Sequence, residues 1–363
     1  MENTFPKVRK IFFEVTNRCN LSCRFCPIRV SRRKKEDMDF DLFKKGIDEI
    51  SDEGIVDTVG FHVLGEPLMY PRIFDAVAYA AEAGLKTELH TNGVLLNHER
   101  IARLSEAGLS DIVISLQFAG EEGHALCRGA LPLEAYYQRV LESAGAFRRK
   151  GVDVTVCYMN TASKRFFTLD GADMKGWDQS PADEAARRVL RDLTEVVDGL
   201  AEEDDIMAVL RKVNPLQPVN VRIDPKTVLF MQPFADWGNA FTGKKVFPAR
   251  IGTCEYGLKN IGVLSSGEVT ICCADYDGHT SLGNLRQGSF REFLGSEQVR
   301  GIERGFRHFI LEEPWCRRCL GAGSPAGAFL KGLLSIYLFS IHGFKPSGEI
   351  REITLKQREA VML

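Results

Sequence analysis

Residues 11–26 read IFFEVTNRCNLSCRFC, an apolar segment followed closely by three cysteines. The first six residues are rich in β-branched and aromatic side chains, which predicts a buried strand over 11–16. Cys19, Cys23 and Cys26 follow with the spacing C-x3-C-x2-C. Three thiolates on one loop can ligate three irons of a cubane cluster and leave the fourth iron open to an external ligand. A zinc site or three incidental cysteines are the alternatives, although structural zinc usually takes four protein ligands in paired spacing.

The chain beyond this loop alternates between strand-like and helix-like segments. Strands are expected over 58–64, 86–90, 111–116, 152–159 and 219–223, and helices over 40–51, 71–83, 97–107 and 133–150. Such alternation implies βα units around a parallel sheet. About six units are present, fewer than the eight of a closed barrel. We therefore predict an α/β partial (β/α)6 TIM barrel over residues 1–225, in which 160–213 form a helical insertion or connection.

Composition and charge exclude several classes of protein. The 363 residues are 44% hydrophobic and 26% charged, as in globular proteins, and the net charge of −2 argues against a nucleic-acid partner. We interpret the basic run over 29–35 (RVSRRKK) as a solvated loop, with an anion or nucleic-acid site as the alternative. The apolar stretch over 329–344 is too short, and too interrupted by Lys331 and His342, for stable membrane insertion. Ten cysteines without a secretory signal indicate metal or redox chemistry in a reducing compartment, the cytoplasm.

The cysteine loop after the first strand resembles the signature of the radical S-adenosylmethionine (SAM) superfamily. The resemblance implies an enzyme in which Cys19, Cys23 and Cys26 hold a 4Fe-4S cluster. SAM would bind the open iron through its amino and carboxylate groups, and one electron would split SAM to give a 5′-deoxyadenosyl radical. It also implies an electron donor such as flavodoxin or ferredoxin.

Further segments at the ends of the expected strands resemble the SAM-binding motifs of this superfamily. The resemblance assigns the SAM ammonium group to the Gly65-Glu66-Pro67 turn, although Leu64 stands where the family has another glycine. Gln117 stands where the family often has aspartate. The remaining contacts implied are Phe25 near the adenine, the Thr91-Asn92 turn, Ser115 and Gln117 at the ribose or carboxylate, and Arg128 at the carboxylate.

Four later cysteines form a second group: Cys254, Cys272, Cys316 and Cys319. Gly267-x4-Cys272 and the final C-x2-C pair resemble the SPASM extension of radical SAM proteins. Because no cysteine follows Cys319, the resemblance is to its one-cluster version, the twitch domain. It implies a fully ligated auxiliary 4Fe-4S cluster, with Cys273 as a possible substitute for Cys272; structural zinc is the alternative. The expected divisions are a linker over 226–251, the SPASM/twitch domain over 252–325 and a C-terminal tail over 326–363.

The spacing of this second group resembles that of twitch-type aminocyclitol dehydrogenases. The first hypothesis is therefore an oxidoreductase-type enzyme that oxidises, epimerises or decarboxylates a small hydroxylated substrate such as a sugar or aminocyclitol. A peptide or protein maturase is the second, although the residues before Cys19 leave no room for an N-terminal recognition domain. The apolar stretch prompts a lipid-modifying enzyme as the third, and a non-catalytic iron–sulfur scaffold also stays open. Cys127 and Cys157 are candidate hydrogen donors or else small buried hydrophobes.

Overall fold

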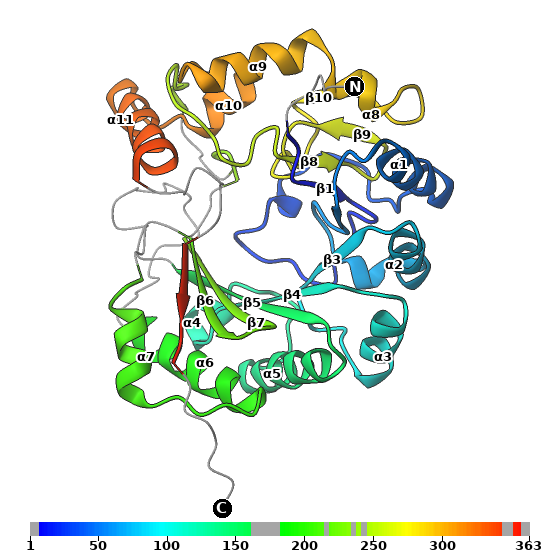
Figure 1. Ribbon diagram of the computed structural model, residues 1–363. Helices are drawn as coiled ribbons and strands as arrows, with labels where there is room; N and C mark the ends of the chain where they lie inside the picture. Colours follow the sequence, from blue (N-terminus) through cyan, green and yellow to red (C-terminus); the bar gives the residue numbers. More distant parts are fainter. Residues whose placement is uncertain are drawn as a thin grey trace, which may run out of the picture. The chain divides into compact units, whose positions relative to one another are not determined.

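The computed structural model describes residues 7–160, 182–213, 218–233, 237–240, 245–342 and 351–356, and Figure 1 labels their helices and strands. The chain divides into two compact units, which are treated one at a time. The first unit comprises Met1–Asn20, Phe25–Glu88 and Ala235–Gly348. The second comprises Leu21–Arg24, Leu89–Phe234 and Glu349–Leu363. The first cysteine loop therefore contributes residues to both units.

The sheet of the first unit has the strand order β10-β9-β8-β1-β2-β3. At its centre β1 (Lys10–Phe13) pairs in parallel with β2 (Thr58–Gly60), and β2 pairs in parallel with the start of β3 (Lys86–Thr91). On its other side β1 pairs in parallel with β8 (Asn260–Val263), with Ile11 opposite Ile261. β9 (Glu268–Thr270) and β10 (Ser281–Asn284) then continue antiparallel. The strands of the second cysteine region thus extend the sheet that begins with β1.

The helices of the first unit follow the two parts of its chain. The N-terminal part forms α1 (Phe40–Glu53) and α2 (Ile73–Glu82), with short 3-10 turns at Pro27–Arg29 and Pro67–Met69. α1 begins where the Asp39 side chain accepts a hydrogen bond from the Leu42 amide at 3.0 Å. The C-terminal part forms α8 (Phe290–Leu294), α9 (Glu297–Arg307), α10 (Pro314–Cys319) and α11 (Pro325–Ile336), followed by a π-helical turn at Tyr337–His342.

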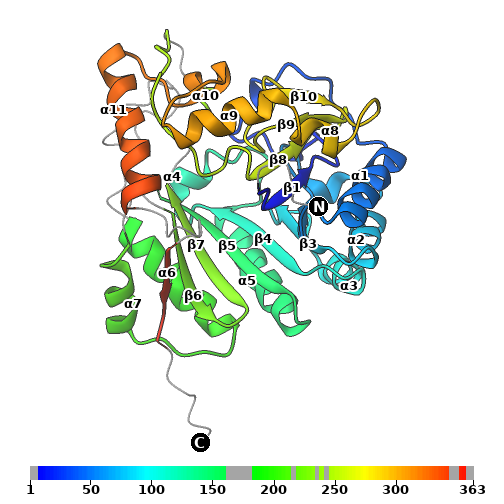
Figure 2. The same cartoon turned by 45° about the horizontal axis from the view of Figure 1, so that its top comes forward.

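The sheet of the second unit has the order β4-β5-β7-β6-β11. Its strands β4 (Asp111–Gln117), β5 (Asp153–Asn160) and β7 (Thr227–Pro233) are parallel. β6 (Val219–Asp224) runs antiparallel to β7, and β11 (Arg351–Thr354) is parallel to β6. The helices are α3 (His98–Glu106), α4 (Glu121–His124), α5 (Leu133–Arg149), α6 (Ala182–Val196) and α7 (Glu203–Leu210). Figure 2 shows α5 lying along β4 and β5, with α6 next to α5.

These elements confirm the predicted α/β class with a parallel sheet of the partial-barrel kind. The sixth parallel strand, however, is β7 and not the segment over 219–223. The chain reverses between β6 and β7 because the Asp224 side chain accepts a hydrogen bond from the Lys226 amide at 2.7 Å, which closes a tight turn. β7 lies within the expected linker over 226–251, which therefore begins inside the sheet. Within the described residues, no helix combines the length and the apolarity that a bilayer crossing needs.

Candidate active site

Cys19 and Cys26 belong to the first unit, where both lie near the ammonium group of Lys35. Burial, and then the neighbouring Arg33, lower the pKa of Lys35, whereas Cys26 and Cys19 act in the opposite direction. Both sulfurs therefore lie within electrostatic reach of Lys35. Phe25, the expected adenine contact, is buried at 6% exposure between them in sequence.

The Leu64–Pro67 turn packs against the residues that lead into Cys19. Gly65 has φ +83°, and a Cβ there would lie 2.2 Å from the Thr16 carbonyl oxygen and 2.9 Å from that of Arg18. No side chain other than hydrogen fits in that space. The next amide, of Glu66, donates a hydrogen bond to the Arg18 carbonyl at 2.7 Å. The glycine of this turn is thus explained by close backbone approach to the cysteine loop.

Glu66 itself lies at 1% exposure, and its carboxylate accepts a hydrogen bond from the Leu68 amide at 3.1 Å. This bond caps the 3-10 turn that begins at Pro67. The carboxylate that the family resemblance assigns to the SAM ammonium group is therefore held in place by its own turn.

A buried ion pair, which the sequence analysis missed, holds the far end of the cysteine loop. Both guanidinium NH2 groups of Arg33 donate to the Glu14 carboxylate, at 2.6 and 2.7 Å, and Glu14 is completely buried. The same carboxylate accepts from the Ser265 amide and hydroxyl and from the Leu64 amide. The interpretation of residues 29–35 as a solvated loop is therefore wrong for Arg33. The ion pair between Arg33 and Glu14 therefore connects the cysteine loop and the end of β1 with the Leu64–Pro67 turn and the loop after β8.

In the second unit, the middle of the cysteine loop lies on the segment that carries Arg128. The amides of Ser22 and Arg24 donate to the carbonyls of Arg128 and Leu126, both at 2.9 Å. A hydrogen bond with the Cys127 side chain is the main cause that raises the pKa of Cys23, followed by burial. Cys127 therefore touches one of the three loop cysteines.

The other candidate hydrogen donor, Cys157, lies elsewhere in that unit. It is buried within β5, where its register partners are Ser115 on β4 and Phe230 on β7. The donor roles of Cys127 and Cys157 stay predictions.

The expected SAM contacts on β3 and β4 are joined by a tyrosine that the sequence analysis did not single out. The Tyr136 hydroxyl lies 2.8 Å from the Asn92 carbonyl and 2.6 Å from the Ser115 carbonyl. Its side chain comes from α5, whose buried face gave no local signal for this role. The Thr91 and Asn92 side chains accept hydrogen bonds from the amides of Gly93 and Val94, which fixes the turn after β3.

Gln117 has two features that fit a bound ligand. Its φ is +62°, in the left-handed region that a non-glycine residue rarely adopts, and the register between β4 and β5 shifts at this point. Its side-chain oxygen is buried and has no hydrogen-bond partner within the described residues. Buried polar atoms are nearly always paired, so an orphan at a strained position suits a site completed by a ligand. Arg128, in the same unit, is exposed.

The four later cysteines come together in the first unit. Burial, followed by Cys254, Cys319 and Cys272, raises the pKa of the Cys316 thiol. Burial and then Cys272 raise the pKa of Cys254 to about 11. Cys316 and Cys319 lie one turn apart on α10. Four partly buried cysteines, of which Cys316 lies within electrostatic reach of the other three, are a donor set that suits a fully ligated iron–sulfur cluster.

Cys272 and Cys273 face different environments. Cys272 packs, together with Cys316, on the apolar cluster of Leu258, Ile271, Val299 and Ile302. Cys273 packs instead on the cluster of Phe12, Val63 and Leu264. A hydrogen bond with the Cys273 side chain, followed by burial, raises the pKa of the Cys272 thiol, whereas the Ala274 amide, which donates to the Cys272 sulfur at 3.4 Å, acts in the opposite direction.

No group of three or more His, Cys, Asp or Glu side chains in the described part of the chain is arranged to hold a single metal ion. The thiols of a cubane each bind a different iron, so they stand farther apart than the ligands of one ion.

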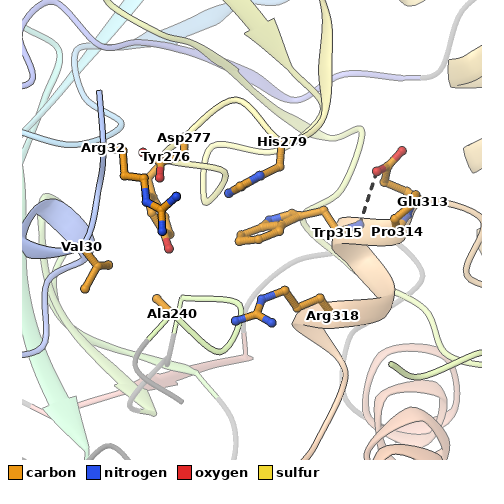
Figure 3. Close-up of a pocket in the computed structure, with 10 residues that line it drawn as sticks. All are labelled: Val30, Arg32, Ala240, Tyr276, Asp277, His279, Glu313, Pro314, Trp315 and Arg318. Carbon is orange, nitrogen blue, oxygen red and sulfur yellow. Dashed lines mark hydrogen bonds between the residues drawn. The ribbon is translucent and has the colours of Figure 1, made fainter. Parts of the chain in front are cut away.

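A pocket of about 690 Å³ lies in the first unit (Figure 3). Val30 and Arg32 line it from the chain that continues beyond Cys26, and Trp315 and Arg318 line it from α10, beside Cys316 and Cys319. Its walls are thus continuous in sequence with both cysteine groups. The other lining residues are Ala240, Tyr276, Asp277, His279, Glu313 and Pro314.

Comparison with known protein families agrees with this geometry. Residues 13–162 match the model of the radical SAM superfamily, and residues 254–320 match SPASM, an iron–sulfur cluster-binding domain. Residues 13–162 therefore carry a radical SAM domain, and residues 254–320 carry a SPASM domain. SAM and iron–sulfur clusters are the cofactors of these two domains.

Curated relatives divide into short and long matches. A PqqA peptide cyclase of Bradyrhizobium diazoefficiens is 37% identical over 124 residues, which are 34% of this chain and 32% of that protein. The subtilosin biosynthesis protein AlbA of Bacillus subtilis is 25% identical over 342 residues, 92% of this chain and 70% of that protein. The chain spans about a third of the length of the first curated relatives it matches.

Among solved structures, anSMEcpe with bound AdoMet has a TM-score of 0.51 at 15% identity. The match covers 91% of this chain and 96% of that one. At this identity the likeness concerns the fold, and it supports the α/β class described above.

Proposed function

We propose that this chain is an oxidoreductase-type radical SAM enzyme that acts on a small hydroxylated substrate, with a second cluster to assist. Cys19, Cys23 and Cys26 would hold the SAM-binding 4Fe-4S cluster. When bound and reduced, this cluster and SAM supply a 5′-deoxyadenosyl radical that abstracts hydrogen from carbon. The observation that carries the proposal is the combination of the radical SAM match with four partly buried cysteines, of which Cys316 lies within electrostatic reach of the other three.

Several of the chain's own residues have proposed roles in binding SAM. The Glu66 carboxylate, fixed by its turn, is the partner proposed for the SAM ammonium group. The buried oxygen of Gln117 lacks a partner within the described residues and would accept a hydrogen bond from the ribose. Arg128 is the proposed partner of the SAM carboxylate, because a guanidinium can donate two parallel hydrogen bonds to it. Phe25, Thr91, Asn92 and Ser115 complete the proposed set.

Cys254, Cys272, Cys316 and Cys319 are the proposed ligands of the auxiliary cluster. Cys272 is favoured over Cys273 because it packs with Cys316 on one apolar cluster, whereas Cys273 packs on a different one. A cluster with four protein ligands exchanges electrons and does not bind substrate. In an alcohol oxidation it would accept the electron that a substrate radical must lose. The proposal also includes reducing conditions, as in the cytoplasm, and an electron donor such as flavodoxin or ferredoxin.

The size of the pocket supports the proposal that the substrate is a small molecule. Its volume of about 690 Å³ lies in the range of sites for small molecules, roughly 300–1,000 Å³. Peptide maturation is the second candidate, and the names of the relatives favour it. One is a peptide cyclase and another serves the biosynthesis of a bacteriocin, the latter matching 92% of this chain.

Deuterium transfer from labelled substrates distinguishes a small hydroxylated substrate from a peptide substrate. Reduced, cluster-loaded protein is given SAM together with deuterated sugars or aminocyclitols, or with deuterated peptides. Deuterium in the 5′-deoxyadenosine product identifies the class of molecule from which hydrogen is taken. Transfer from peptides alone would overturn the small-substrate proposal, and no 5′-deoxyadenosine under any condition would overturn radical SAM activity.

A further inference from the structure

The pocket in Figure 3 brings two guanidinium groups to one cavity from opposite walls. Arg32 enters from the segment that follows Cys26, and Arg318 enters from α10. We propose that Arg32 and Arg318 together bind an oxyanion, the carboxylate or phosphate group of a small substrate. This inference rests on the proposed function, since it names the chemical class of molecule that the enzyme takes.

The two arginines are not neutralised by the protein around them. Arg32 makes neither a hydrogen bond nor an ion pair within the described residues, and its side chain is exposed. Arg318 donates to the Asn239 carbonyl at 3.3 Å, a long hydrogen bond to a neutral acceptor, and forms no ion pair with any described residue. A guanidinium carries five donors, so both side chains retain most of theirs for a ligand.

The two acids that line the same pocket are already engaged. Asp277 accepts a hydrogen bond from the Ser31 hydroxyl at 2.5 Å and lies 3.9 Å from the Arg33 guanidinium. Glu313 accepts a hydrogen bond from the Trp315 amide at 3.3 Å, which caps α10. Figure 3 shows the Glu313 carboxylate on the far side of Trp315 from Arg32. Neither acid is placed to neutralise Arg32 and Arg318 together.

The wall between the two arginines is rigid and adds a further donor. The His279 ring stacks on Trp315, with centroids 3.9 Å apart and an angle of 20° between the planes. Fully buried Asp275 holds the chain beneath, accepting from the amides of His279 and Thr280. The His279 ring is left to donate toward the cavity, where Figure 3 shows it beside Trp315. A fixed wall lowers the entropy cost of ordering the site around an anion.

The position of the site suits the proposed chemistry. Arg32 lies six residues after Cys26, and Arg318 lies directly before Cys319. An oxyanion held by both would anchor a substrate on chain segments that also carry cluster ligands. Bidentate contact by a guanidinium fixes orientation as well as affinity, which a site-selective hydrogen abstraction requires.

Binding of two probe anions to the cluster-loaded protein tests this inference. Inorganic phosphate is followed by 31P line broadening, and 13C-acetate by 13C line broadening, for wild type, Arg32→Gln and Arg318→Gln. Arg29→Gln is the matched control, because it removes an exposed charge from the same loop outside the pocket. Each pocket variant should weaken binding by about tenfold or more, while the control stays within about twofold of wild type. The anion that binds more tightly identifies the substrate group as phosphate or carboxylate.

Folding and the proposed function are monitored separately. Arg32→Lys and Arg318→Lys keep the charge but lose the planar fork, so they should bind with intermediate affinity. Iron content and melting temperature establish that each variant folds and carries clusters. The inference is overturned if neither anion binds to wild type, or if Arg29→Gln weakens binding as much as the pocket variants do. Formation of 5′-deoxyadenosine from SAM without substrate reports on the proposed function alone, and its absence would refute that function whatever the anions do.

Discussion

Replacing Arg33 with methionine should destabilise the protein by about 3–5 kcal/mol, because it leaves a buried carboxylate without its counter-charge. Glu14 has no exposed surface, and two of its five hydrogen bonds come from Arg33. The remaining donors, on Ser265 and Leu64, are neutral. Methionine fills much of the space of the arginine stem, so the loss reflects charge and hydrogen bonding more than volume.

The pair of Arg18 and Asp37 provides a matched control in the same loop. Their N–O distance is 3.2 Å, but the Arg18 side chain is 50% exposed. An exposed pair of this kind contributes about 0–1 kcal/mol, so Arg18→Met should change the free energy of unfolding by no more than that. The difference between the two variants isolates the effect of burial.

Urea unfolding of the cluster-free protein under anaerobic conditions, followed by far-UV circular dichroism, measures both values. Arg33→Lys should lie between wild type and Arg33→Met, since it keeps the charge but loses the two-pronged contact. Adding Glu14→Gln to Arg33→Met should restore part of the loss, because it removes the stranded charge. The reasoning is refuted if Arg33→Met costs no more than Arg18→Met.

Three further substitutions test the site. Cys272→Ala should lower the iron content by about four atoms per chain, whereas Cys273→Ala should leave it unchanged, as measured by iron and sulfide analysis of reconstituted protein. Gly65→Ala should slow 5′-deoxyadenosine formation at least about tenfold, because the new Cβ meets the Thr16 carbonyl. Gly84→Ala is the control, since Gly84 has a similar φ of +82° but open space around it. This control should cost only about 1–2 kcal/mol of stability and leave the rate unchanged. Tyr136→Phe removes the hydroxyl between two carbonyls and should weaken SAM binding about tenfold in equilibrium dialysis, while an unchanged affinity would contradict this positioning role.

Local pattern was sufficient for most of the parallel sheet. Helices expected over 40–51 and 133–150 are found at Phe40–Glu53 and Leu133–Arg149, because their apolar spacing and end signals lie within each segment. The expectation failed at 219–223, which is a strand but not a parallel neighbour of β5. Strand direction there depends on a two-residue turn and on the partner chosen across the sheet, which periodicity does not specify.

The cysteine groups can be proposed from the sequence because the chemistry expected of them follows from their spacing. Residues that act through distant partners could not. Arg33 looks like one more member of a basic run until the fold brings Glu14 and Ser265 to it. Tyr136 carries no signal on its own helix for the two carbonyls that it bridges. The pocket joins four separate stretches of chain, so its paired arginines become visible only in three dimensions.

The most direct test of the central claim is whether this protein splits SAM by reduction at its first three cysteines. Anaerobically reconstituted wild type should convert SAM to 5′-deoxyadenosine when dithionite is added. The Cys23→Ala variant should make none, while its later cysteines still retain about four iron atoms per chain. Equal 5′-deoxyadenosine formation by wild type and Cys23→Ala, or none by fully iron-loaded wild type, would contradict the account.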